Sequence, residues 1–436
     1  MNARVKSMLL LLTGMLLGII GFSWTQSIAH KGPHLGKNWR SHPQPAFTNA
    51  QKMFQKAKKL LKHHYVDSKV TEDKLYKAAV QGMLHYIDPK MSRWNRLITP
   101  SEHKELQIAL RHEIVGIGIM LRFEKDDGYA TILGLIPGSP AKAAGLRSGD
   151  KILKVDGHLF KGKSFRKMVY AIRGKVGTHV KLTLLRGGKL REVTVKRNRI
   201  RWDAVTSHLF KDGVGYLRID SFSQKTPVLV EKHLKGLRTK KARALIIDLR
   251  GNRGGLLKTA LQSADLFLKK GAIITQLKKR KGKVEAKLAK RDDLSAGLPI
   301  HLLSGPRTSS GAELFIAALR DNRGARVIGS RTLGKWSAQT LSKLGNGYFL
   351  KFTVSHFLSP KGKSYQFKGL TPDIQVKTPK ACQRLLREHR KLSSVQQCDS
   401  PLRIAKLLLA QRSGPHPTRS KSQQKSPLST SGKGRK

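Results

Sequence analysis

The chain has 436 residues, of which 86 are Lys or Arg and 27 are Asp or Glu, so its formal net charge is +59. This length predicts two to three domains, and a hydrophobic content of 39% allows a sizeable core and excludes wholesale disorder. The composition also excludes collagen-like, coiled-coil and multi-span membrane proteins. Two cysteines are too few for a disulfide-dense scaffold or a four-cysteine zinc site. The charge itself predicts attraction to anionic polymers or surfaces, and no particular fold.

The first 29 residues have the pattern of an export signal or a membrane anchor. Arg4 and Lys6 precede an uncharged run over residues 8–24, and residues 27–29 form a small-x-small cleavage site. The uncharged run is at the lower limit for a spanning helix, so a cleaved signal over 1–29 and a retained anchor both stay open. Either alternative places the rest of the chain in the cell envelope, exported to the periplasm or held at the inner membrane.

Export changes how the two cysteines are interpreted. An oxidising compartment favours a disulfide between Cys382 and Cys398, which have 15 residues between them. In the chain-entropy model, closing a loop of this size contributes about 3 kcal/mol. The alternative of two unpaired buried thiols stays open, and no partner histidine gives either cysteine a catalytic role.

Between residues 30 and 198 the sequence pattern changes from one typical of helices to one typical of strands. Residues 30–46 are polar and contain proline, which indicates a linker. The segment 47–112 is helical in pattern, with two amphipathic stretches, and Asp88-Pro89 stops the second one. Residues 113–198 predict a small, mainly antiparallel β unit with two short helices, which opens on a glycine-rich strand over 116–121.

The second half alternates strands and helices. Within residues 199–380, the apolar strands expected over 214–219, 244–249 and 300–303 predict a buried, mainly parallel sheet. We expect helices at 227–237, 256–268 and 312–319, and a further strand at 325–328. The remaining segments are a helical one at 381–412 and a basic tail at 413–436 that we expect to be disordered.

One sequence motif points to a different function. Residues 157–164 match the P-loop pattern G-x-x-x-x-G-K-[ST], and Asp248 ends an apolar strand as a Mg²⁺-binding residue does. A nucleotide hydrolase is therefore the formal alternative. Against it, the match begins in a tight Asp-Gly turn, contains the bulky Leu159 and Phe160, and falls in a small antiparallel unit. Export also places the chain where ATP is scarce.

A serine stands where a strand leads into a helix. Ser310 with Glu313 three residues later forms a capping box, which is the usual role of such a pair. A serine at a helix N-terminus is also suited to chemistry, because the backbone N–H groups there point outward and stabilise an oxyanion. Both interpretations stay open from these residues alone.

A nucleophilic serine needs a base, and no histidine of this region lies beside an orienting carboxylate. Lys335 is the next candidate, and in an extended segment it would share one face with Gln339, which is able to orient its amine. A lysine base must be neutral, so its pKa must fall by about 3 units. Burial beside Leu333 and Trp336 is one source of that shift. The alternative is a solvated surface lysine.

A glycine loop closes one of the apolar strands. Residues 248–255 read Asp-Leu-Arg-Gly-Asn-Arg-Gly-Gly, and its glycines allow backbone N–H groups to approach a developing charge closely. An ordinary strand-to-helix turn is the alternative. The G-x-G-x-x-G fingerprint of dinucleotide-binding proteins is absent here.

Taken together, these segments resemble the C-terminal processing (tail-specific) peptidases, secreted serine peptidases with an inserted PDZ domain. The resemblance covers residues 47–376 and includes the Asp-Pro stop. In the PDZ region it rests on the motifs at 116–119, 137–146 and 148–157. The family's serine and lysine are 25 positions apart, with a glutamine four positions after the lysine. Ser310, Lys335 and Gln339 keep both spacings.

The resemblance implies a mixed α/β fold with a ClpP/crotonase-like αβ protease core, a PDZ domain of mainly antiparallel β structure and an N-terminal helical segment. It implies that Ser310 is the nucleophile, Lys335 the general base and Gln339 the residue that orients it. The implied oxyanion donors are the N–H groups of Gly254, Gly255 and Gly311. The implied binding residues for a substrate's C-terminal tail are Gly116, Ile117, Gly118, Ile119 and Arg173.

The expected activity is endopeptidase cleavage of envelope proteins near their C-termini, without metal or other cofactor. Protein substrates are the expected partners, with an adaptor protein as a further one and no nucleic acid. The chain departs from the family at Arg253, where proline is common, and at Trp336, where glycine is usual and where an indole would narrow the cleft. Ser309 is a second hydroxyl beside the nucleophile. A catalytically silent PDZ adaptor of the envelope is the alternative function.

Overall fold

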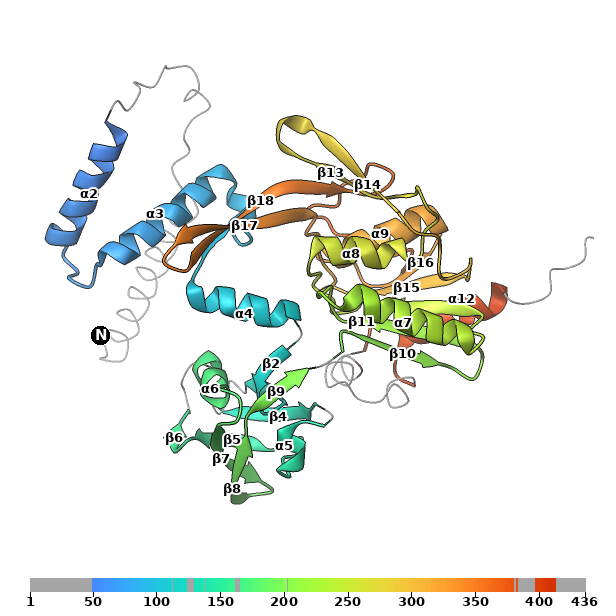
Figure 1. Ribbon diagram of the computed structural model, residues 1–436, viewed down its shortest axis with the longest axis horizontal. Coiled ribbons are helices and arrows are strands. Elements are labelled where there is room, and N and C mark those ends of the chain that lie inside the picture. The colour runs from blue at the N-terminus through green and yellow to red at the C-terminus, as the bar shows by residue number, and fades with distance from the viewer. Residues whose placement is uncertain are drawn as a thin grey trace, which may run out of the picture. The chain divides into compact units, whose positions relative to one another are not determined.

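Figure 1 shows the computed structural model of the chain, which describes residues 49–111, 113–123, 129–136, 138–160, 165–201, 203–379, 382 and 397–412. The chain divides into two compact units, one ending at Ala78 and the other beginning at Ala79. The predicted export segment, linker and basic tail lie outside the described residues. Among the residues described, none of the helices has both the length and the apolar character needed to span a bilayer.

The helical segment contains the two helices that its apolar periodicity predicts. Helix α2 spans Ala50–His64 and helix α3 spans Glu72–Ile87. Helix α3 ends before Asp88, whose carboxylate accepts two backbone N–H groups of the short helix η2 (Pro89–Met91). The predicted stop at Asp88-Pro89 is therefore confirmed. Two further elements follow, β1 (Arg96–Ile98) and α4 (Pro100–Arg111).

The β-rich unit is antiparallel, as predicted, and its two ends meet. Strand β2 (Glu113–Gly116) enters the unit and pairs with β9 (Asn198–Arg201), which leaves it. Between them a sheet has the order β3 (Ile119–Phe123), β4 (Ala130–Leu135), β5 (Lys151–Val155), β7 (His179–Arg186) and β8 (Lys189–Lys196), with β6 (His158–Leu159) on β5. Helices α5 (Pro140–Ala143) and α6 (Phe165–Ile172) contribute side chains to its core.

Two details of this unit differ from the sequence-based expectations. The single strand expected over 116–121 is wrong, because the chain is interrupted between β2 and β3. Gly118 has a φ of +83°, and a Cβ there would lie 2.3 Å from the Cβ of Ser139, so only glycine fits. The P-loop lookalike begins in the turn after β5, and β6 lies inside the motif. A P-loop connects a strand directly to a helix, so this segment is not one.

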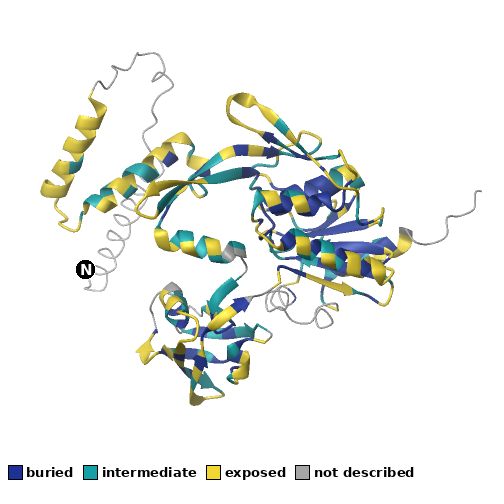
Figure 2. Ribbon diagram, in the orientation of Figure 1, coloured by how far each residue is buried: buried dark blue, intermediate teal, exposed yellow. Residues whose placement is uncertain are grey.

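The largest sheet is the mainly parallel one that the alternating pattern predicts. Its order is β10 (Val205–Leu209), β11 (Val214–Ile219), β12 (Ala244–Asp248), β15 (Ile300–Ser304), β16 (Arg326–Gly329) and β19 (Ile374–Gln375). Only the β10–β11 pair is antiparallel. Figure 2 shows β12 and β15 buried along their whole length. Helices on both faces explain why these strands are buried and mainly apolar.

Each face of this sheet has its own helices. Helices α7 (Thr226–Thr239), α8 (Leu257–Asp265) and α9 (Gly311–Arg323) form one core with alternate strand residues such as Leu245 and Ile247. Helix α12 (Ser400–Arg412) covers the other face, where Leu402, Ala405 and Leu409 pack with Ile246 and Leu303. The mixed α/β fold class expected from the sequence is confirmed, with helices on both faces of the mainly parallel sheet.

A second sheet was not predicted from the sequence. It contains β1, β13 (Ile273–Lys278), β14 (Val284–Leu288), β17 (Ser337–Gly345) and β18 (Tyr348–Leu358), all joined by antiparallel pairs. Figure 1 shows β17 and β18 as a long hairpin. This hairpin begins two residues after Lys335 and carries Gln339, so it supplies part of the candidate site.

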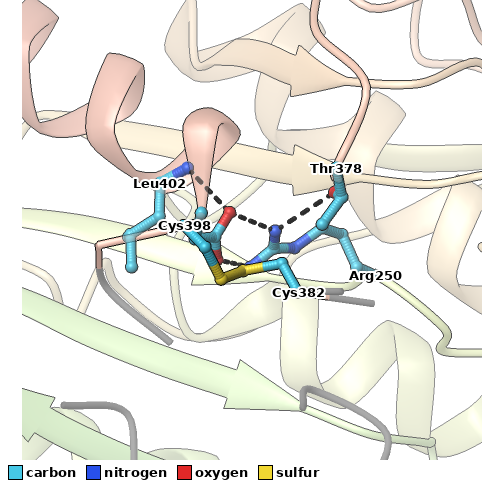
Figure 3. The surroundings of a disulfide bond; sticks show 6 residues. Arg250, Thr378, Cys382, Cys398 and Leu402 are labelled. Carbon is cyan, nitrogen blue, oxygen red and sulfur yellow. Dashed lines mark hydrogen bonds and ion pairs between the residues drawn. A yellow bond between two sulfur atoms is a disulfide. The ribbon is translucent and has the colours of Figure 1, made fainter. Parts of the chain in front are cut away.

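The C-terminal segment is tied back to the large sheet. Cys382 and Cys398 form a disulfide with their Cα atoms 5.8 Å apart (Figure 3). Cys382 follows β19, and Cys398 lies two residues before α12. The bond therefore joins the chain that leaves the sheet to the helix that covers it.

Candidate active site

Ser310 occupies the turn between the β15 connection and helix α9. Its backbone has φ +60° and ψ −124°, a conformation that L-residues rarely adopt, and its residue surface is 8% exposed. Such a strained residue persists only where its surroundings hold it. Its N–H group donates to Glu313 Oε2 at 2.8 Å, which is the capping contact expected from the sequence. In a capping box the serine oxygen only accepts a hydrogen bond, so the hydroxyl proton stays available to a base and the two interpretations are compatible.

The carboxylate of Glu313 connects the serine turn to the lysine segment. The residue is fully buried, and its Oε2 accepts the N–H groups of Ser310 at 2.8 Å and of Lys335 at 2.9 Å. The two backbone nitrogens are therefore held on one oxygen atom. Its Oε1 accepts the Gly334 N–H at 2.8 Å and the Thr332 hydroxyl. Sequence reasoning assigned Glu313 only a capping role, because the lysine segment lies 22 positions away.

These contacts also favour the ionised form of Glu313. Burial raises the pKa of the Glu313 carboxyl above its usual value, and hydrogen bonds from Thr332, Ser310, Gly334 and Lys335 limit the rise. The Thr332 hydroxyl accepts the Leu370 N–H at 2.7 Å, so its own proton goes to Glu313. Every partner is therefore a donor, and a protonated carboxyl would have nowhere to donate.

Lys335 is held in a poorly hydrated position two residues before β17. The pKa of its amine is lowered to about 8, chiefly by burial and also by the charge of Lys351, while the charge of Glu313 opposes the shift. The direction is the one that a lysine base requires. The expected shielding by Leu333 is wrong, because that side chain is 43% exposed.

Trp336 does not narrow the cleft as expected from the sequence. Its indole is fully buried in the main core and lies against the Tyr365 ring, with a centroid separation of 4.8 Å. Its backbone N–H donates to Gln366 Oε1 at 2.6 Å. Trp336 thus anchors the start of β17 from the core side, one residue after Lys335.

Gln339 lies on β17, beyond a register shift of the strand. Its Nε2 donates to Ser337 Oγ at 2.9 Å and to Thr353 Oγ1 at 3.2 Å. Thr353 in turn donates through its N–H and its hydroxyl to Asn95 Oδ1, both at 2.9 Å. Among the described residues no hydrogen bond joins Gln339 to Lys335. The orienting role of Gln339 stays a prediction, with its carbonyl oxygen as the group able to accept from the amine.

The glycine loop between β12 and α8 packs directly on the serine turn. A Cβ on Gly254 would lie 2.9 Å from both Ser310 Cβ and the nitrogen of Gly311, so no larger residue fits. The Gly254 N–H, however, donates to Asn252 Oδ1 at 2.8 Å. This contact occupies the donor of Gly254 in this conformation, so its expected oxyanion role stays a prediction that requires the Asn252 contact to break. Gly255 and Gly311 are the remaining candidates, and neither N–H has a partner among the residues described.

The PDZ-like unit has a separate groove, which contains every tail-binding residue predicted from the sequence. The pocket has a volume of about 210 Å³ and is lined by Ile114, Gly116, Ile117, Gly118, Ile119, Leu121, Ile136, Phe165, Val169, Ile172 and Arg173. Strand β3 is the edge strand of its sheet, which leaves one side open for an added strand. The lining is apolar apart from Arg173.

Arg173 is the charged group of this groove. Burial lowers the pKa of its guanidinium, and the charge of Glu105 opposes this shift. Its Nε is buried and lacks a hydrogen-bond partner within the part of the chain that the structure describes. A half-buried cation whose Nε donor is buried and unpaired favours an anionic ligand.

Comparison with known proteins follows the same division of the chain. The model of peptidase family S41 matches residues 213–376, and the PDZ domain model matches residues 115–196. The "Probable CtpA-like serine protease" of Staphylococcus epidermidis is 31% identical over 372 residues, which cover 84% of this chain and 72% of that protein. The chain belongs to peptidase family S41. It is a serine-type enzyme of the CtpA-like, carboxy-terminal processing group.

Two further relatives of this S41 peptidase are informative. The carboxy-terminal processing protease CtpA of Bacillus subtilis is 31% identical over 366 residues, which cover 84% of this chain and 76% of that protein. A solved candidate S41 protease of Bacteroides fragilis has a TM-score of 0.52 at 18% identity, and the match covers 74% of this chain and 88% of that one. This likeness supports the fold. The family resemblance read from the sequence is thereby confirmed, and so is the serine peptidase activity.

Proposed function

We propose that this S41 peptidase uses Ser310 as its nucleophile and Lys335 as its general base. The observation that carries the proposal is that a single oxygen of Glu313 binds the backbone N–H groups of both residues. This contact holds the two segments together although they lie 25 positions apart in the chain. The lowered pKa of Lys335 provides the neutral amine that a base needs.

The proposed reaction proceeds through an acyl-enzyme. The Ser310 hydroxyl attacks the carbonyl carbon of a peptide bond while Lys335 Nζ accepts its proton. The N–H groups of Gly255 and Gly311 donate to the oxyanion, and Gln339 orients the lysine amine. Lys335 then gives the proton to the leaving amine nitrogen as the C–N bond breaks. Water, deprotonated by Lys335, cleaves the Ser310 ester and releases the new carboxyl end.

The proposed substrates are envelope proteins with apolar C-terminal tails. The open edge of β3 supports strand addition by an extended tail, and the apolar lining of the groove accepts its side chains. Arg173 is the proposed partner of the terminal carboxylate, because it is the cation that lines the pocket and its buried Nε donor is unpaired among the residues described. The periplasm, with or without inner-membrane anchoring through residues 8–24, remains the proposed location on the sequence pattern alone.

The test is a cleavage assay with residues 30–436 and an unfolded reporter that ends in an apolar tail. Wild type is compared with Ser310→Ala and Lys335→Ala in the absence of ATP. Cleavage by wild type and by neither variant is the expected result. Cleavage by Ser310→Ala would remove Ser310 as the nucleophile and direct attention to Ser309. Tail binding without cleavage in every form would favour the silent PDZ adaptor.

A further inference from the structure

A buried arginine connects the glycine loop of the active site to the C-terminal segment. Arg250 lies in that loop, and its side chain is 8% exposed. Its Nη2 lies 2.6 Å from Asp248 Oδ2, and its Nη1 and Nη2 each lie 2.7 Å from an oxygen of Asp399. We propose that the Cys382–Cys398 disulfide and Asp399 form a strut that positions the glycine loop through Arg250 (Figure 3).

The loop end of the strut is joined to the serine turn. The Arg250 N–H donates to Asp248 Oδ1 at 2.9 Å, so its backbone and its side chain are both fixed on the same carboxylate. Its side chain lies against Gly305, where a Cβ would be 3.6 Å from Arg250 Cγ. Gly305 begins the connection from β15 to Ser310. Arg250 therefore touches both segments that meet at the nucleophile.

The other end of the strut is fixed from two directions. The carboxylate of Asp399 is fully buried, and it accepts the Leu402 N–H at 3.3 Å at the start of α12. Asp399 also follows Cys398 directly, and the disulfide attaches Cys398 to Cys382 beyond β19. Figure 3 shows Arg250, Thr378, Leu402 and the disulfide grouped around this point. The disulfide is the covalent part of the support.

The physical consequence concerns where the loop donors lie. Without the Asp399 carboxylate, two guanidinium N–H groups of Arg250 would lose their acceptors in a buried site, and the loop would shift to hydrate or re-pair them. An oxyanion donor is effective only within about 3 Å of the developing charge. A shifted loop would move the Gly255 N–H away from that position. Turnover would then fall, while tail binding in the separate groove would not change.

The strut can be opened by a chemical step. A dithiol reductant transfers two electrons and two protons to the disulfide, which becomes two thiols, and the reductant closes to its own disulfide. Asp399 then keeps its contacts with Arg250 and the Leu402 N–H but loses the covalent attachment of its neighbour Cys398 to Cys382. The peptidase is therefore predicted to be less active in a reducing environment than in an oxidising one.

The experiment compares the oxidised full chain with the same protein after dithiol treatment. Hydrogen–deuterium exchange is measured on peptides over residues 249–256, and steady-state kinetics are measured on the tailed reporter. We expect exchange in that loop to increase about tenfold and kcat to fall about tenfold, with KM unchanged. The exchange arm does not depend on the proposed function. An enzyme that cleaves nothing in either state would refute the proposed function and leave the strut to be decided by exchange.

Variants separate the strut from general damage. Asp399→Ala is expected to lower kcat about 100-fold without any reductant, and Asp399→Glu to recover part of the loss. The double variant Cys382→Ser, Cys398→Ser should match the reduced wild type and should not respond to dithiol. Asp212→Asn is the matched control. It removes the charge of another carboxylate that pairs with the C-terminal segment, at 2.9 Å from Lys406 of helix α12. Equal loop exchange in the oxidised, reduced and Asp399→Ala proteins would overturn the proposal.

Discussion

The PDZ groove and the peptidase site treat a buried charge in opposite ways. In the groove, the Nε donor of Arg173 is buried and has no partner among the residues described. In the peptidase site, the buried carboxylate of Glu313 accepts hydrogen bonds on both oxygens. A buried group without a partner favours a ligand that supplies one, whereas a fully satisfied group rigidifies its surroundings. Recognition of a substrate tail therefore requires an unpaired polar group, whereas positioning of Ser310 and Lys335 requires a fully paired one. We expect that each can be altered without the other.

The largest separation should come from removing the base. Lys335→Met is expected to lower kcat/KM by about 10⁴-fold, because the Ser310 proton then has no acceptor. Binding of a tail peptide to the groove should stay unchanged, as measured by fluorescence anisotropy. Lys343→Met, an exposed change on the following strand β17, is the control and should keep full activity. An equal loss of tail affinity in Lys335→Met would contradict the independence of the two sites.

The satisfied carboxylate should matter for stability and for rate. Glu313→Gln replaces one carboxylate oxygen with an NH₂ group. That group would face N–H or O–H donors, so the hydrogen bonds to that oxygen are lost and the donors are left unpaired. We expect a loss of about 3 kcal/mol in the free energy of unfolding and a fall of about 100-fold in kcat. Denaturant titration and steady-state kinetics measure the two effects. Glu285→Gln, in an exposed cluster with Lys279 and Lys287, serves as control. A variant with wild-type kcat would show that Glu313 does not position the dyad.

The unpaired arginine should affect recognition alone. Arg173→Met is expected to raise KM for a tailed substrate by about tenfold to 100-fold and to leave kcat unchanged. Amidation of the substrate's C-terminus removes the proposed partner, so wild type and variant should then have equal KM. If the variant loses the same factor on amidated and free tails, Arg173 does not read the carboxylate.

The smallest effect concerns pH. Because the base must be neutral, kcat/KM should rise with pH through the Lys335 pKa of about 8 and fall as the amine is protonated below it. The Lys351 charge lowers this pKa, so Lys351→Met should move the midpoint upward and reduce activity at pH 7 by less than about threefold. A pH–rate profile of each protein measures the change. A midpoint that moves downward would contradict the assigned charge effect.

The sequence predicts those parts of the molecule that local pattern determines. The strand over 214–219 agrees with β11, because burial on both faces makes it apolar at every position except Arg218. The spacing of Ser310, Lys335 and Gln339 is also visible without a structure. The second sheet was missed because β17 is exposed along most of its length, so no alternation of apolar residues marks it.

Long-range polar contacts explain the remaining differences. The bond from Lys335 to Glu313 and the pair between Arg250 and Asp399 join residues 22 and 149 positions apart. Neither leaves a local sequence pattern. The Gly254 N–H donates to the side chain of Asn252, which is only two residues away. This local contact depends on the conformation of the loop, so no sequence pattern indicates it. The sequence pattern therefore locates the candidate residues. The hydrogen bonds of the folded chain decide which of their donor and acceptor groups are free to bind substrate.

The central claim is that Ser310, activated by Lys335, is the attacking group. The most direct measurement is covalent labelling of the native chain by a serine-reactive fluorophosphonate, with the labelled residue mapped by mass spectrometry. We expect the label on Ser310 and none on the neighbouring Ser309. We also expect the labelling rate to fall steeply in Lys335→Met. Label on Ser309, or labelling of Ser310 at an unchanged rate without Lys335, would contradict it.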